Sequence, residues 1–257
     1  MADEESGPMP WRTGGTTRSF WLRASQAIIL MVAASAAAAV LLWPRKPWYS
    51  ERARAEVLRG IRVDGNLEDW PEGMQRYALT YRPGAEFRVA YDPDENLLYV
   101  AVEVADADLV VGHDWHTTDA CEVNVWGGGG PHPSNPLQYA LVPGSGEYIA
   151  GLGNPTLNAG GKSSPANTTR TRAAFRYDGK VITYEWAVEV YDRYWERPAQ
   201  LTDGKKIGFD VVVVDKQSDG YHGWTPWGSP GVHKFERPEN LGELELTSER
   251  VRVPRGE

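Results

Sequence analysis

Cysteine is almost absent from this sequence: Cys121 is the only one among 257 residues. A single thiol cannot form an internal disulfide. CxxC pairs and histidines at metal-ligand spacing are also missing, which excludes a structural zinc site. Cys121 alternates with Val123 and Val125, so we expect it to be a small buried hydrophobic side chain rather than a nucleophile.

Basic residues are scarce relative to acidic ones. The chain has 27 lysines and arginines and 35 aspartates and glutamates; five of the basic and three of the acidic residues precede Trp48, which leaves a formal charge of −10 from Trp48 onward. Nucleic-acid binding needs a basic footprint and is therefore disfavoured. The phosphate-binding motifs GxGxxG and GxxxxGKS/T are missing too, so we interpret glycines 127–130 as a flexible loop.

One long run is both uncharged and predominantly apolar, residues 24–43. About 20 apolar residues are enough to cross a bilayer as a helix, so we predict an uncleaved signal-anchor after a polar tail at 1–23. The alternative is a cleaved signal peptide, processed at small residues near 34–36. We expect a stalk at 44–60, an extracytoplasmic domain at 61–247 and a short tail at 248–257.

Alternation of apolar and polar residues dominates the rest of the chain. Residues 87–104 read as a complete hairpin, with turn chemistry at 92–96 between two alternating strands. Residues 151–167 are expected to form a long loop, 191–195 a helical turn and 220–228 an aromatic loop. We predict further strands at 77–80, 119–126, 138–142, 147–150, 172–177, 180–190, 207–214 and 241–246. The fold class is therefore all-β, an immunoglobulin-like or jelly-roll β-sandwich preceded by a single N-terminal transmembrane helix.

Six short motifs, taken in order, resemble the family 9 carbohydrate-binding modules across residues 61–246. They are IRVDGNLEDW, NLLYVAVEVADADL, DACEVNVW, TYEWAVEV, IGFDVVVVD and NLGELEL. The resemblance implies a β-sandwich that binds oligo- or polysaccharide without catalysis, with stacked tryptophans and structural calcium. For Ca²⁺, a cation that takes hard oxygen ligands, the candidate ligands are the loop residues Asp106, Asp108, Asp215 and Asp219.

Tryptophan is abundant, with eleven against five phenylalanines. The apolar faces of a sugar stack on flat rings while its hydroxyls need directional partners, so aromatic loops with polar neighbours are candidate sugar sites. We predict a platform at Trp224 and Trp227, with His222 beside it and Trp115 as an opposing ring. The alternative is that one of the two platform rings plugs the end of the sandwich. Trp186 lies in a strong strand pattern and is expected in the core.

Two other functions stay open at this stage. The same sandwich resembles haem-binding subunits of bacterial dehydrogenases, whose axial ligands could come from His113, His116, His222 or His233. A glycoside hydrolase would need a pair of carboxylates, for which Glu185, Glu189 and Glu122 are available. A purely structural ectodomain is the remaining possibility.

Overall fold

The computed structural model describes residues 51–80, 82–112, 116–128, 135–144, 150–153, 155–159, 161–231 and 233–249. The expected tail at 1–23 and membrane segment at 24–43 lie outside these residues. Among the residues described, no helix combines the length and apolar character needed to span a membrane.

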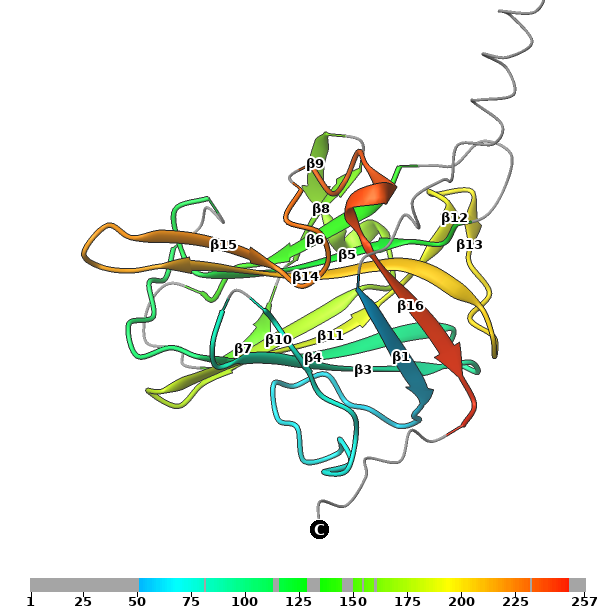
Figure 1. Cartoon of the computed structure of the whole chain (residues 1–257), viewed down its shortest axis with the longest axis horizontal. Helices are drawn as coiled ribbons and strands as arrows, with labels where there is room; N and C mark the ends of the chain where they lie inside the picture. The colour runs from blue at the N-terminus through cyan, green and yellow to red at the C-terminus, as the bar shows by residue number, and fades with distance from the viewer. Residues whose placement is uncertain are drawn as a thin grey trace, which may run out of the picture. The chain divides into compact units, whose positions relative to one another are not determined.

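Two layers of antiparallel strands face each other (Figure 1). Alternating side chains explain this, because each strand has one apolar face to bury. The first layer contains β2 (Tyr77–Ala78), β3 (Ala85–Asp92), β4 (Leu97–Ala105), β7 (Ala150–Gly153), β10 (Arg172–Tyr177) and β11 (Val181–Val188). The second contains β5 (Ala120–Trp126), β6 (Leu137–Leu141), β8 (Thr156–Ala159), β9 (Lys162–Pro165), β14 (Lys206–Lys216) and β15 (His222–Pro226). The predicted all-β sandwich is thus confirmed.

One side of the sandwich is closed by the first and last strands, β1 (Arg52–Val57) and β16 (Gly242–Thr247). They run parallel in the register Arg52↔Glu243 to Glu56↔Thr247. β1 also pairs with β3, and β16 pairs with β14, so hydrogen bonding continues from one layer into the other. Figure 1 shows the two strands side by side at this closed side.

The core between the layers is built by the alternating residues of the longest strands. The hairpin predicted at 87–104 is confirmed as β3 and β4, and its Phe87, Val100 and Val102 are fully enclosed. Trp186 of β11 has no exposed surface, as expected. Cys121 is likewise buried in this core.

The outer face of the first layer is covered by the segment between β1 and β2, which supplies a second apolar cluster including Ile61, Val63 and Trp70 (Figure 1). The segment is fastened by Glu185, which accepts hydrogen bonds from the backbone N–H groups of Asp64 and Gly65 at 2.8 Å each. The indole of Trp70 donates to the same carboxylate at 2.9 Å.

Strands occur in four places where the sequence predicted other structure. β1 lies within the expected stalk at 44–60, and β8 and β9 lie within the expected loop at 151–167. β12 (Tyr191–Arg193) and β13 (Arg197–Pro198) form a small hairpin instead of a helical turn at 191–195. β15 replaces the expected aromatic loop at 220–228. Two 3-10 helices, η1 (Ala166–Thr168) and η2 (Pro238–Asn240), complete the described elements.

Candidate functional site

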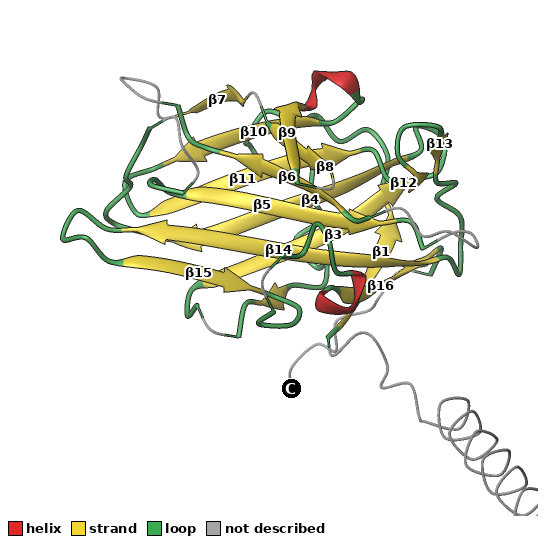
Figure 2. Ribbon diagram, turned by 90° about the horizontal axis from the view of Figure 1, so that it is seen from above, coloured by secondary structure: helices red, strands yellow, loops and turns green. Residues whose placement is uncertain are grey.

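A cavity of about 480 Å³ lies on the outer face of the second layer. Figure 2 shows β15, β14, β5, β6 and β8 side by side in this layer. β15 and β16 pair with different halves of the same edge of β14, so the chain between them has to leave the sheet and return to it; its described residues, 227–231 and 233–241, form a crossing segment. This crossing segment supplies one wall. The lining residues are His116, Glu122, Gln138, Asn158, Ser163, Val214, His222, Trp224, His233, Lys234 and Phe235.

The floor of the cavity is a chain of polar side chains from three neighbouring strands. Because Cys121 and Val123 point into the core, Glu122 points outward. The Gln138 amide donates to Glu122 Oε2 at 2.8 Å, and the Asn158 amide donates to Gln138 Oε1 at 3.0 Å. Asn158 is only 6% exposed, and its Oδ1 has no hydrogen-bond partner in the described structure. A buried acceptor without a partner is unfavourable, so a ligand donor would be stabilised there.

Glu122 is the only carboxylate among the described lining residues. Burial raises the pKa of Glu122 to about 7, and the nearby charge of Asp210 acts in the same direction, while the hydrogen bond from Gln138 opposes the rise. The group therefore changes between acceptor and hydroxyl donor near neutral pH.

Trp224 and Phe235, both partly exposed, provide the aromatic surface. Trp224 lies on β15 opposite Val214, and the Lys234 ammonium is 5.8 Å from its ring centroid. Phe235 comes from the crossing segment and meets the ring of His233 edge-on, with centroids 5.9 Å apart.

Lys234 holds the crossing segment in place. Its ammonium is buried, donates to the backbone oxygens of Ser229 and Asn240, and forms an ion pair with Asp210. Asp210 also accepts from the backbone N–H groups of Trp227 at 3.0 Å and Gly228 at 2.9 Å. Both ends of the segment are therefore tied to one buried ion pair, which fixes the position of the wall that the segment forms.

Only part of the predicted aromatic platform lies at the cavity. Trp224 and His222 line the cavity, whereas Trp115 lies outside the described residues. Trp227 is 4% exposed, so its assignment as a stacking ring is wrong. Residues three apart on an extended chain face opposite sides, and Trp227 turns inward.

Core groups cover Trp227. Its ring centroid lies 5.2 Å from that of Phe87 and 6.0 Å from that of Phe209. A Cβ at position 242 would clash with the same ring, so Gly242 is required for this packing. Trp227 thus closes the edge of the core, the alternative considered from the sequence.

An acidic cluster lies at the other end of β14. One carboxylate oxygen each from Asp106, Asp119 and Asp215 lie within 4.8 Å of one another. Asp106 and Asp215, two of the four predicted calcium ligands, therefore lie close together. Asp119, the third residue of the cluster, was not predicted from the sequence. Asp108 and Asp219 are not in this cluster: Asp108 accepts from both the backbone and the hydroxyl of Ser218, and Asp219 accepts from the N–H of Tyr221.

The donor set of this cluster fits calcium. Asp215 is 1% exposed, and its Oδ1 has no described partner, although Arg82 pairs with the other oxygen and lies 3.7 Å from Asp106. Burial, helped by the charges of Asp106 and Asp215, raises the pKa of Asp119 to about 7, although the backbone N–H groups of Lys216 and Val110 donate to it and oppose the rise. A single guanidinium does not balance three carboxylates, so a divalent cation with hard oxygen ligands would complete the site.

The carboxylates proposed for a hydrolase do not form a pair. Glu185 lies on the outer face of the first layer, enclosed by its three donors, and Glu122 lies on the outer face of the second. Glu189 accepts from Arg170 and from the Tyr191 hydroxyl; although burial raises its pKa, these hydrogen bonds hold it below the ordinary value. Glu185 and Glu189 are therefore engaged in structural contacts, and Glu122 lies on a different face of the sandwich.

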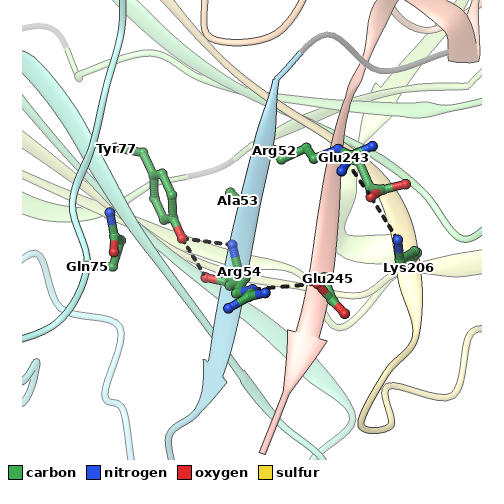
Figure 3. A pocket seen from close by; sticks show the side chains of 8 residues that line it. All are labelled: Arg52, Ala53, Arg54, Gln75, Tyr77, Lys206, Glu243 and Glu245. Carbon is green, nitrogen blue, oxygen red and sulfur yellow. Dashed lines mark hydrogen bonds and ion pairs between the residues drawn. The ribbon is translucent and has the colours of Figure 1, made fainter. Parts of the chain in front are cut away.

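A second hollow of about 300 Å³ lies over β1 and β16 (Figure 3). Its charges satisfy one another: Arg54 pairs with Glu245 at 3.5 Å, and Lys206 pairs with Glu243 at 3.0 Å. The Tyr77 hydroxyl accepts from the Arg54 N–H at 2.8 Å. These mutual contacts leave it less suited to a ligand than the cavity on the second layer.

Comparison with known proteins agrees with this architecture. The family model described as carbohydrate family 9 binding domain-like matches residues 72–249. Two solved structures of a family 9 carbohydrate-binding module from Caldicellulosiruptor kristjanssonii are similar in fold. The cellotriose complex has a TM-score of 0.59 and 16% identity, covering 80% of this chain and 100% of that one. The glucose complex has a TM-score of 0.56 and 15% identity, covering 79% and 100%.

No curated protein matches the sequence. The family match nevertheless extends over most of the chain, from before β2 to the end of β16, and the two-layer fold is that of the solved modules. This protein is a member of the carbohydrate family 9 binding domain-like family.

Proposed function

We propose that this protein binds an oligo- or polysaccharide, without catalysis, in the cavity on its second layer. The observation that carries the proposal is the combination of the Trp224 ring with the polar chain Glu122–Gln138–Asn158, whose last member leaves Oδ1 without a partner. A sugar needs both an apolar surface for its C–H faces and fixed partners for its hydroxyls.

The comparisons support glucose-based ligands as the first to test. The two similar structures are described as complexes with cellotriose and with glucose. The experiment is isothermal titration calorimetry of the full chain with cellotriose, after a glycan array. If the apolar run at 24–43 requires detergent, a detergent without a sugar head group avoids competition for the site.

Variants test whether this cavity is the site. Asn158→Ala and Gln138→Ala are expected to weaken binding, because each removes part of the polar floor. Trp195→Ala is the matched control, since Trp195 is 76% exposed and is not among the cavity residues. A blank array in the presence of calcium would refute sugar binding, and unchanged affinity in both floor variants would place the site elsewhere.

We further propose that residues 24–43 anchor the domain to a membrane, with residues 61–247 outside the cytoplasm. The uncharged run of this length supports the proposal. Membrane fractionation followed by N-terminal sequencing tests it. A soluble product beginning near residue 37 would show that the segment is cleaved.

Calcium is proposed as a structural ion at Asp106, Asp119 and Asp215. The fit of the donor set supports it, together with the partnerless Oδ1 of Asp215. An ion there would fasten the end of β14 to the chain on either side of the loop before β5. Its role would be to hold this end of the sandwich and not to contact sugar.

A further inference from the structure

Three of the five histidines in the chain line the candidate sugar cavity. They come from three separate segments: His116 precedes β5, His222 begins β15, and His233 lies in the crossing segment. All three are exposed, so they form a rim around the buried floor. The fold thus brings three imidazoles from distant parts of the sequence to the opening of the cavity.

The rim contrasts with the rest of the molecule in its charge. The whole chain has a formal charge of −8, yet the described residues of the cavity include a single carboxylate, Glu122, and it is on the floor. The other charged residue that lines the cavity is Lys234 of the crossing segment, whose ammonium is paired with the buried Asp210. The imidazoles therefore place N–H donors at the opening, while the carboxylate is confined to the floor.

His233 occupies its place at a conformational cost. Its φ of +59° is in the left-handed region, which is unfavourable for residues other than glycine. The backbone carbonyl of His233 accepts from the N–H groups of Glu236 at 3.0 Å and Arg237 at 3.2 Å, which hold the turn. Residues kept in such conformations are frequent at binding sites.

We propose that the sugar bound in this cavity is acidic, with a uronate carboxylate recognised by the rim formed by His116, His222 and His233. The inference rests on the proposed sugar-binding function and specifies its ligand class. Neutral hydroxyls meet the floor and the Trp224 ring, while the carboxylate accepts N–H donors at the opening. Charge-assisted hydrogen bonds of this kind are stronger than neutral ones.

The test compares two ligands of the same length and linkage: cellotriose, and the trimer of β-1,4-linked glucuronate, in which a carboxylate replaces each hydroxymethyl group. Calorimetry of the full chain at about pH 6 is expected to show the uronate trimer binding about ten-fold tighter or more.

Rim variants provide the second arm. His116→Gln, His222→Gln and His233→Gln should each weaken uronate binding several-fold and change cellotriose affinity by less than about two-fold, because only the charged contact is lost. Lys180→Gln is the control, since it removes an exposed positive charge from the turn between β10 and β11 in the other layer.

Equal affinity for both trimers overturns the inference while leaving sugar binding intact. A uronate preference that survives in the triple variant also overturns it, since the rim is then not its source. Binding of neither trimer overturns the proposed function itself.

Discussion

Trp224 and Trp227 are three residues apart, and the structure gives them opposite roles. Trp224 faces the cavity, whereas Trp227 is buried against Phe87 and Phe209. We therefore predict that Trp224→Ala impairs sugar binding with little loss of stability, and that Trp227→Ala unfolds the domain at a lower temperature. Trp195→Ala, which removes an exposed ring, serves as the control for both.

The expected magnitudes follow from these surroundings. Truncating a fully packed Trp costs about 3–5 kcal/mol, which includes the loss of the edge-on contact with Phe87. In a domain of this size, this lowers Tm by roughly 6–20 °C. Truncating Trp224 costs about 1–2 kcal/mol of stability, since its ring is only partly buried. Loss of a stacking ring costs about 1–3 kcal/mol of binding, or roughly 5- to 150-fold in Kd.

Thermal denaturation and calorimetry with the sugar ligand measure the two quantities on the same samples. The reasoning is refuted if Trp227→Ala melts like the wild type, because its ring would then not be part of the core. It is also refuted if Trp224→Ala binds sugar normally. A Trp227→Ala protein measured well below its Tm should retain binding, apart from its unfolded fraction.

Three further outcomes are expected. The pKa of Glu122 is raised to about 7 from an ordinary value near 4.3, so its contribution to stability is present at low pH and is lost as pH rises through about 7. Glu122→Gln should therefore gain stability relative to the wild type between about pH 5 and 8, measured by urea titrations. A stability difference that stays constant over this range contradicts the prediction. Saturating calcium should raise Tm by about 5–10 °C in the wild type and not in Asp119→Asn, so an unchanged Tm after chelation argues against the ion. Glu185→Gln should destabilise the protein by about 1–3 kcal/mol, because the three donors to Glu185 lose part of their acceptor. Neither the wild type nor this variant should hydrolyse aryl-glycosides. Turnover by the wild type that the variant loses would revive the hydrolase hypothesis.

Strong alternation made the central strands predictable from sequence. β3, β4, β5, β11 and β14 all lie where apolar residues recur at every second position, because each buries one face against the opposite layer. Asp64-Gly65, in the first of the six motifs, is a typical turn pair, and Gly65 has the positive φ, +81°, that such a turn needs.

Shorter strands were missed where pairing with distant residues decides the structure. β1 has small or charged residues at most positions, and it becomes a strand because β16 and β3 provide partners on both sides. β8 and β9 contain Asn, Ser and Pro, which locally favour turns, yet β8 adds to the edge of β6. Local propensity cannot predict such strands, because it carries no information about partners that are distant in sequence.

The cavity was predictable only in part for the same reason. Trp224 and His222 were found because an aromatic segment with polar neighbours is visible in one stretch of sequence. Gln138 and Asn158 become a pair only when β6 and β8 align, with the two residues directly opposite each other. The available signal was a polar residue at a position within an otherwise apolar strand, as for Gln138 in LQYAL.

The parallel pairing of β1 with β16 also determines when the sandwich can be completed. The two strands are 191 residues apart in sequence, since Arg52 aligns with Glu243. During synthesis, the edge of β1 therefore has no partner there until the last strand leaves the ribosome, and contacts of such sequence separation form slowly. An unpaired edge can add strands from other chains. Truncation before Gly242 should thus produce aggregation rather than a shorter soluble domain.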